Sequence, residues 1–248
     1  MDQPVFVLLA VGMLVAAFGY ASVGHGGASA YIAVMALASV APHEMRPTAL
    51  LLNVLVSSLA TWKFRSAGHF RWRLFWPFAA MSIPMAYVGG AVSLPGHAYK
   101  VVIGIVLLYA AVQLWRSGRK GQEMREVRPP RLTAALAIGA VLGLLSGLTG
   151  VGGGIFLSPL LLMLGWAGTK ETSAVSAPFI LVNSIAGLAA HFASKGFGLP
   201  SYVPILAVAV LVGGWLGAEY GARRFANPVV RQVLAVVLAL AGGKMIMV

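Results

Sequence analysis

Two stretches of sequence, GHGG at residues 24–27 and GVGGG at residues 150–154, are glycine clusters set between long apolar runs. They lie 126 positions apart (150 minus 24), and the same shift aligns residues 57–58 with residues 183–184. Self-similarity at a fixed offset is the mark of an internal repeat. The spacing therefore predicts two related halves, with a glycine cluster at the corresponding place in each.

The composition is that of a membrane protein. Hydrophobic residues make up 59% of the 248 residues and charged residues 10%. A soluble domain of this length cannot bury so much apolar surface, so the lipid bilayer is predicted to be a partner. The net charge of +12 comes from basic residues in short gaps between apolar runs, as the positive-inside rule expects, and no nucleic acid partner is predicted. The absence of cysteine excludes disulfides, thiolate metal sites and cysteine nucleophiles, and no cofactor or metal is predicted.

Apolar runs between charges predict ten helices, near residues 4–22, 27–41, 45–64, 73–94, 98–116, 132–149, 153–167, 171–193, 200–222 and 228–247. Two of these, directly after the glycine clusters, hold only fifteen residues each. A helix needs about twenty residues to cross the hydrocarbon core. Short or broken helices are therefore predicted at the clusters.

A hydrophilic, basic segment at residues 117–131 divides the chain into a first transmembrane repeat, 1–116, and a second, 132–248. Its charge predicts a cytoplasmic linker. The other gaps rich in lysine and arginine are 63–73 in the first half and 223–231 in the second. Five passes per half place both gaps inside and both chain termini outside.

An odd number of passes inverts the second half relative to the first. The predicted fold class is therefore all-α, a polytopic transmembrane helical bundle built from two inverted repeats of about five segments each. Many secondary transporters have this architecture, with the substrate near the bilayer midplane where the repeats meet.

The glycine clusters are the predicted binding site. A glycine-rich break at the start of a half-helix exposes backbone N–H groups at the positive end of the helix dipole, which together bind anions. Irregular backbone at membrane depth must be buried in protein or line a polar cavity. We predict that the substrate is bound by the clusters and the polar residues around them, namely Ser22, Gly24, His25, Gly26, Gly27, Asn53, Ser57, Thr149, Gly150, Val151, Gly152, Gly153, Gly154, Ser176, Asn183 and Ser184.

Other glycines are predicted to serve helix packing. They stand four residues apart, in the small-xxx-small pattern that lets helices approach closely, at Gly139, Gly143, Gly147, Gly213, Gly217 and Gly221. The glycine clusters have packing as their alternative role, but packing does not require consecutive glycines beside shortened helices.

Polar residues inside the apolar segments have two interpretations each. His25 can donate to an anion or titrate with a proton flux, or it can be a neutral hydrogen-bonded histidine of the interior. Asn53 and Asn183 need a partner, which is either the substrate or a neighbouring helix. Glu219 is predicted to pair with Arg223 one helical turn away. Carboxylates are nearly absent from the apolar segments, which favours an anionic substrate over a cation.

Four stretches carry a resemblance to a known family: GHGGASAYIAV at 24–34, RPTALLLNVLVSS at 46–58, GVGGG at 150–154 followed by Pro159, and SAVSAPFILVNS at 173–184. They resemble the TauE/SafE sulfite-exporter family of membrane permeases. The resemblance spans both halves and implies a permease for sulfite, sulfonates or related organosulfur anions in the cytoplasmic (inner) membrane of bacteria. The two clusters differ, since His25 stands where the second half has Val151.

The predicted function is a secondary transporter that moves a small sulfur-containing oxyanion by alternating access, and not an enzyme. One alternative is an anion channel of the same architecture. A remoter one is an intramembrane serine hydrolase using Ser146 and His191, although the glycine of the usual nucleophile motif is missing two residues before the serine. The predicted partners are a small anionic substrate and the bilayer, and a homo-oligomer is left open.

Overall fold

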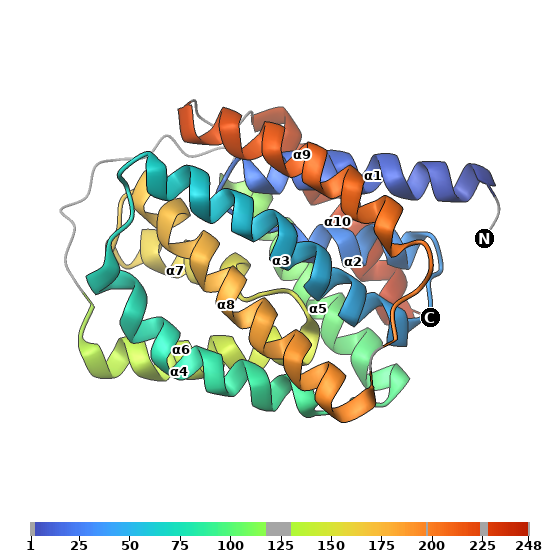
Figure 1. Cartoon of the computed structure of the whole chain (residues 1–248), viewed down its shortest axis with the longest axis horizontal. Helices are drawn as coiled ribbons and strands as arrows, with labels where there is room; N and C mark the ends of the chain where they lie inside the picture. Colours follow the sequence, from blue (N-terminus) through green and yellow to red (C-terminus); the bar gives the residue numbers. More distant parts are fainter. Residues whose placement is uncertain (1–2, 118–129, 197, 224–227, 248) are drawn as a thin grey trace.

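A computed structural model describes residues 3–117, 130–196, 198–223 and 228–247. This part of the chain contains ten helices and no strand, so the predicted all-α class is confirmed (Figure 1). The helices are α1 (Gln3–Ala21), α2 (Ala28–Leu37), α3 (Pro42–Ser66), α4 (Trp72–Ala91), α5 (Gly96–Ser117), α6 (Leu132–Thr149), α7 (Gly154–Met163), α8 (Thr169–Lys195), α9 (Val203–Arg223) and α10 (Pro228–Met247). By length and composition α4, α5, α6, α8 and α9 can each span a membrane. Most of the predicted linker lies outside the described residues.

The two helices that follow the glycine clusters, α2 and α7, have ten residues each and are shorter than predicted. Each begins after a glycine in the left-handed conformation, Gly27 with φ of 102° and Gly153 with φ of 78°. Each is followed by a second left-handed residue, Ser39 with φ of 58° and Gly165 with φ of 66°. Gly153 lies 126 residues after Gly27, and Gly165 lies 126 residues after Ser39. Left-handed residues cannot continue an α-helix, which is why these helices are short.

Two helix pairs pack backbone to backbone through glycine. On α6, a Cβ at each glycine would overlap a carbonyl oxygen of α4: Gly139 meets Phe78, Gly143 meets Ser82 and Gly147 meets Ala86. On α9, the glycines meet carbonyl oxygens of α1 in the same way: Gly213 meets Leu14, Gly217 meets Phe18 and Gly221 meets Ser22. The predicted packing role of these glycines is confirmed.

These contacts also give the directions of the helices. In both glycine-packed pairs the residue numbers rise together, so α4 is parallel to α6 and α1 to α9. The contacts between α3 and α8 run the other way, since Asn53 bonds Ser184 while the earlier residue Leu50 lies against the later residue Gly187. In α5 and α10, Gly104 lies against Ile246 and Leu108 against Gly242, which is again antiparallel.

Two further contacts complete the set of directions. Val56 of α3 lies against Gly214 of α9, and Lys63 of α3 pairs with Glu219 of α9, so these helices are parallel. Arg46 near the start of α3 bonds the end of α4, so α3 and α4 are antiparallel. Helices α1, α3 and α9 therefore run one way and α4, α6 and α8 the other. Each of α1, α3, α4 and α5 is opposite in direction to the helix five places later in the chain.

The two ends of the bundle differ in charge. The N-terminus and the C-terminus lie at one end, and the end of α5 and the start of α6 lie at the other (Figure 1). Near the linker end are the basic residues Lys63, Arg65, Arg71, Arg73, Arg116, Arg131 and Lys170. The opposite end has Lys100, Lys195, Lys244 and the buried Arg46.

Replacing Gly143 with leucine should destabilise the bundle, because the new side chain would overlap the Ser82 carbonyl and force α6 away from α4. Overpacking of this kind costs about 1–3 kcal/mol or more. We expect the detergent-purified Gly143→Leu variant to have a lower Tm than the wild-type protein. The Tm is measured by heating samples and following the folded peak in size-exclusion chromatography. Gly243→Leu is the matched control, since no heavy atom lies within 4 Å of a Cβ there. Equal Tm values for the two variants would contradict the close α4–α6 contact.

Candidate functional site

Asn53, in the middle of α3, connects the first glycine cluster with the second half of the chain. Its Oδ1 accepts a hydrogen bond from the N–H of Ala28, the first residue of α2, at 3.3 Å. Its Nδ2 donates to Ser184 Oγ on α8 at 2.8 Å. A Cβ at Gly26 would overlap Asn53 Oδ1, and a Cβ at Gly152 would overlap Asn53 Nδ2. Both clusters therefore lie against a single amide side chain.

Ile180 of α8 is a second side chain shared by the two clusters. Its Cγ2 lies 3.1 Å from the position of a Cβ at Gly26 and 2.9 Å from that of a Cβ at Gly152. Its Cδ1 approaches Gly154, the first residue of α7, closely enough to exclude a side chain there. The N-termini of α2 and α7, which come from different halves of the chain, thus meet at the same place.

Eight buried residues at the two helix starts have N–H groups that find no acceptor among the residues that the structure describes: Gly26, Gly27, Ser29, Ala30, Gly152, Gly153, Gly154 and Ile155. An α-helix leaves its first N–H groups without partners inside the helix, and burial normally forces them to find partners elsewhere. A buried donor without an acceptor costs about 1–3 kcal/mol. The arrangement is a concentrated set of donors at the positive ends of two helix dipoles.

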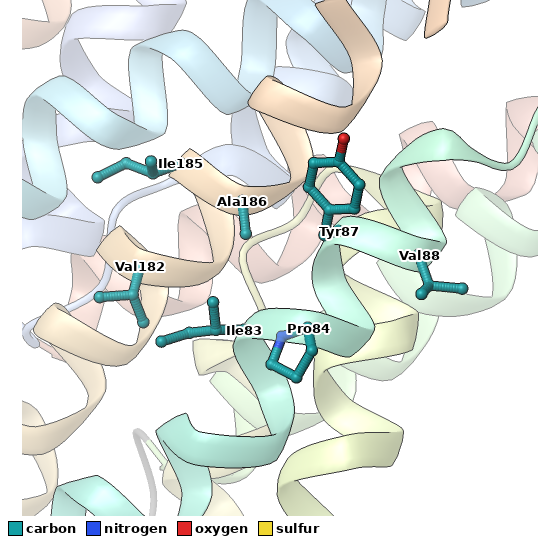
Figure 2. A pocket seen from close by; sticks show the side chains of 7 residues that line it. All are labelled: Ile83, Pro84, Tyr87, Val88, Val182, Ile185 and Ala186. Carbon is teal, nitrogen blue, oxygen red and sulfur yellow. The ribbon is translucent and has the colours of Figure 1, made fainter. Parts of the chain in front are cut away.

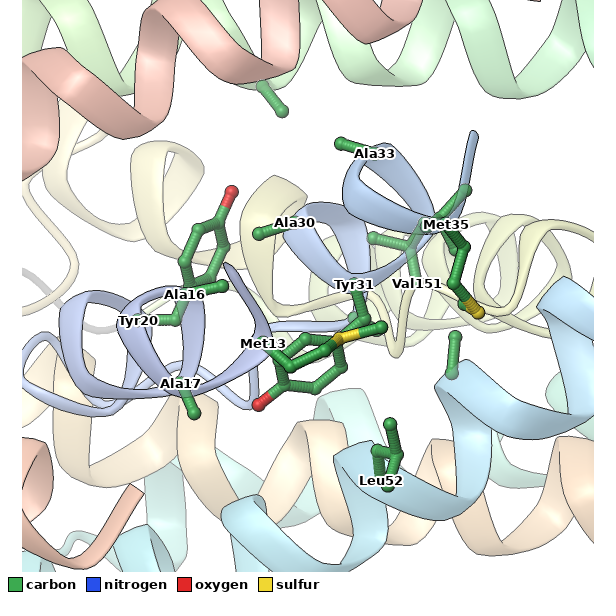
Figure 3. Close-up of a cluster of buried hydrophobic side chains, with 14 of the residues drawn as sticks. Met13, Ala16, Ala17, Tyr20, Ala30, Tyr31, Ala33, Met35, Leu52 and Val151 are labelled. Carbon is green, nitrogen blue, oxygen red and sulfur yellow. The ribbon is translucent and has the colours of Figure 1, made fainter. Parts of the chain in front are cut away.

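Tyrosine side chains hold the first break in place. The hydroxyl of Tyr31, one turn into α2, donates to the Gly26 carbonyl at 2.7 Å. The hydroxyl of Ser29 donates to Tyr20 of α1 at 2.9 Å. Figure 3 shows both tyrosines between α1 and α2, where alanines such as Ala30 leave room for the rings. These bonds fix the start of α2 relative to α1.

His25 begins a chain of hydrogen bonds to α7 and α8. Its Nδ1 lies 3.1 Å from the Val23 carbonyl oxygen, and its Nε2 lies 3.0 Å from Ser158 Oγ. Ser158 Oγ lies in turn 2.8 Å from Ser176 Oγ. A carbonyl only accepts, so Nδ1 carries the hydrogen. In the neutral imidazole Nε2 then accepts from Ser158, and Ser158 accepts from Ser176.

The structure brings some of the predicted site residues together and separates others. Gathered around Asn53 and Ile180 are Gly26, Gly152, Gly154 and Ser184, with His25 and Ser176 joined to them through α7. Gly27 lies against Tyr31, and Gly153 lies against Phe179 and Ser146. Gly24 and Gly150 lie farther out, Gly24 against Ser173 of α8 and Gly150 against Arg46 of α3.

The other predicted residues bond within their own helix or loop. The side chains of Ser22, Ser57, Thr149 and Asn183 donate to the carbonyls of Gly19, Asn53, Leu145 and Phe179, respectively. The N–H of Val151 lies 3.4 Å from Thr149 Oγ1, and its side chain packs beside α2 (Figure 3). Asn53 and Asn183 therefore differ: Asn53 joins two helices, while the Asn183 amide, among the described residues, bonds its own helix.

Two residues that the sequence analysis missed lie beside the clusters. Ser158 stands one turn after Gly154 in a segment that was predicted as a short helix, and this position was the available signal. Arg46 is only 4% exposed, and it donates to the carbonyls of Gly89, Gly90 and Val92 at the end of α4. An arginine within an apolar segment is itself a sign of an internal role.

The described carboxylates pair away from the glycine clusters. Glu44 accepts from Tyr202, Glu171 pairs with Arg71, and Glu219 pairs with Lys63. The predicted partner of Glu219, Arg223, has its side chain outside the described residues. The donors at the two helix starts therefore face none of these three acids.

A groove of about 690 Å³ lies between α4 and α8, away from the clusters (Figure 2). It is lined by Ile83, Pro84, Tyr87, Val88, Val182, Ile185 and Ala186. An apolar lining of this kind offers an anion almost no hydrogen bonds and is suited to lipid chains. The groove is therefore not a candidate for the substrate site.

The geometry gives no support to a serine hydrolase. Ser146 Oγ is buried and has no hydrogen-bond partner among the described residues, so His191 does not activate it. A nucleophilic serine requires a base within hydrogen-bond reach.

Comparison with known proteins agrees with the membrane character of the chain. The model of the family described as sulfite exporter TauE/SafE matches residues 8–245. The chain is 40% identical over 240 residues, 96% of its length and 97% of the relative's, to "Probable membrane transporter protein y4hK" of Sinorhizobium fredii (strain NBRC 101917 / NGR234). It is 29% identical over 117 residues, 46% of its length and 41% of the relative's, to "Probable membrane transporter protein YunE" of Bacillus subtilis (strain 168). No solved structure matches. The chain therefore belongs to the TauE/SafE sulfite exporter family and is a membrane transporter, not an enzyme.

Proposed function

We propose that this transporter carries a small sulfur-containing oxyanion, such as sulfite or an organosulfonate, bound between the N-termini of α2 and α7. The observation that carries the proposal is the set of eight buried N–H donors without described acceptors at these two helix starts. An anion at this place would accept their hydrogen bonds and lie at the positive end of both helix dipoles.

The shape of the donor set favours an oxyanion with several oxygens around one centre. Donors approach from two helices that belong to opposite halves of the chain, and Asn53 and Ser184 lie between them. A sulfite or sulfonate group presents three oxygens in different directions and can accept from both helix starts at once. A carboxylate presents two oxygens in one plane and would leave more of the donors unpaired.

The directions of the helices support a pair of inverted repeats. Helices α1, α3, α4 and α5 are each antiparallel to the helix five places later, and left-handed residues recur 126 positions apart. Inverted repeats are the usual basis of alternating access, in which the two halves rock around a site at the midplane. We infer the domain division from the same facts, with 1–116 and 132–248 as the two repeats.

The buried state of the site favours a carrier over an anion channel. Gly24 is packed against Ser173 on the linker side of the site, and Gly150 against Arg46 on the other side. A conducting channel needs a continuous path, whereas a carrier needs two closures that open in turn. We infer that these two contacts are the closures.

The charge difference between the two ends suggests the orientation. The basic residues gather at the linker end, so this end is placed in the cytoplasm and both termini outside, in the cytoplasmic (inner) membrane of a bacterium.

The substrate is tested in proteoliposomes with labelled sulfite, thiosulfate, methanesulfonate and acetate. We expect the three sulfur oxyanions, and not acetate, to be taken up faster when the lumen is preloaded with the same unlabelled anion. Such acceleration requires a carrier that changes between its two open states with the unlabelled anion bound. Conductance without acceleration would indicate a channel, and uptake of acetate alone would overturn the substrate class.

The binding site is tested by Gly26→Ala and Gly152→Ala. Each added methyl group overlaps the Asn53 amide, and alanine is further disfavoured at Gly152, where φ is +79°. We expect each variant to lower sulfite uptake at least tenfold, by displacing the donors from the anion.

Gly96→Ala is the control for these variants, because nothing lies within 4 Å of a Cβ at Gly96. It should keep normal uptake. Normal uptake by both cluster variants, at equal protein content of the liposomes, would place the substrate elsewhere.

The orientation is tested with single cysteines, which the absence of native cysteine makes straightforward. Gly96→Cys at the start of α5 and Gly168→Cys before α8 lie at opposite ends of the bundle, and both positions have open space. In intact cells a membrane-impermeant maleimide should label residue 96 and not residue 168. The reverse pattern would place the linker outside, and labelling of both or neither would leave the bundle ends on one side of the membrane.

A further inference from the structure

We propose that the transporter takes up one proton with each anion and that His25 is the residue that holds it. The inference rests on the proposed function, because the anion between α2 and α7 is one of the two coupled ligands. It identifies the coupling ion, which neither the family nor the relatives' names specify.

His25 lies within the first glycine cluster and contacts the start of α7. Its Cδ2 lies 3.7 Å from the position of a Cβ at Gly154, the first residue of that helix. It is partly exposed, whereas Ser176 at the far end of its hydrogen-bond chain is fully buried. The chain from His25 through Ser158 to Ser176 therefore links a partly exposed side chain to the interior.

Protonation reverses the direction of this chain. With neutral His25, the hydroxyl of Ser176 donates to Ser158, and the hydroxyl of Ser158 donates to Nε2. With a proton on Nε2, the imidazolium donates to Ser158, and Ser158 donates to Ser176. The hydroxyl hydrogen of Ser176 is then released to donate to another acceptor.

The released hydroxyl lies on the face of α8 that meets the anion site. Ser176, Ile180 and Ser184 are spaced four residues apart, which places them along one face of the helix. Ile180 lies against both glycine clusters, and Ser184 bonds Asn53. Ser176 is one turn away from Ile180, so its hydroxyl can be turned toward a bound anion.

Electrostatic interactions also make binding of the proton and binding of the anion favour each other. An imidazolium beside the positive end of the α7 dipole is unfavourable by itself and becomes favourable when an anion occupies the helix start. By linkage, the anion then binds more tightly to the protonated protein by the same factor. The second cluster has Val151 in the place of His25, so the two clusters supply a single imidazole.

The contacts identified between His25 and other helices are with an aromatic ring and serine hydroxyls. From α1 the ring of Tyr20 meets it edge-on with centroids 6.2 Å apart, and from α7 and α8 the groups are serine hydroxyls. Ser173 of α8 donates to the Val23 carbonyl, which also accepts from His25. At the same end of the bundle Lys63 pairs with Glu219, and Arg71 with Glu171.

The test measures proton uptake when thiosulfate or methanesulfonate binds to the full-length protein in detergent. Both anions remain fully ionised across the range in which an unperturbed histidine titrates, about pH 5 to 8, so any proton taken up is bound by the protein. Titration calorimetry in buffers of different ionisation enthalpy gives the number of protons per anion. We expect net uptake near pH 7.5 and a Kd on the order of tenfold lower at pH 6 than at pH 8.

His25→Gln keeps a polar side chain beside Ser158 but cannot take a proton. We expect it to abolish proton uptake and flatten the pH profile of Kd, whatever its effect on Kd at a single pH. Ser158→Ala keeps the imidazole, breaks the chain to Ser176 and should reduce the proton number, so it carries the test if the glutamine variant binds too weakly. Ser58→Ala, whose hydroxyl is exposed and bonds its own helix, is the control and should behave as wild type.

The outcomes separate this inference from the proposed function. Anion binding with no proton uptake by the wild-type protein, or undiminished uptake by His25→Gln, overturns the role of His25 and leaves the anion site standing. Failure of the wild-type protein to bind either anion overturns the anion site and, with it, this inference.

Discussion

A backbone N–H group that is buried in a membrane protein has to donate its hydrogen bond, because no water is present to accept it. Helices meet this requirement everywhere except at their first turn. In this protein two first turns, those of α2 and α7, lie in the interior and face each other across Asn53. The arrangement conflicts with the usual demand for satisfied donors. Under the proposed function, a negatively charged solute with several oxygens accepts these hydrogen bonds.

The rest of the bundle serves to hold these two turns in place. Gly27 and Gly153, in the left-handed conformation, precede the short helices α2 and α7. Glycines on α6 and α9 let the backbones of α4 and α1 pack directly against them. Tyr31 and Asn53 then fix the first break through hydrogen bonds to Gly26 and Ala28. If an anion binds here as proposed, these contacts hold the donors in position before it arrives.

The two halves are alike in backbone and different in chemistry. Gly24 and Gly27 have left-handed counterparts in Gly150 and Gly153, yet His25 faces a hydroxyl chain while Val151 packs against α2. Arg46 lies on one side of the site only, where it donates to the end of α4. The two sides of the proposed site are therefore chemically unequal, as the proposed proton-coupled mechanism requires.

The sequence alone was sufficient for the helices, the membrane class and the family, since hydropathy, charge gaps and the two GHGG and GVGGG motifs are local properties of the chain. It also indicated Asn53 and the glycine clusters as candidate site residues, because polar or flexible residues inside apolar segments require a structural or functional role. The pairing of Asn53 with Ser184, the chain from His25 to Ser158, and the pairing of Glu219 with Lys63 were decided only by the tertiary structure. These contacts join residues more than a hundred positions apart, and no local pattern specifies which faces of two distant helices will meet.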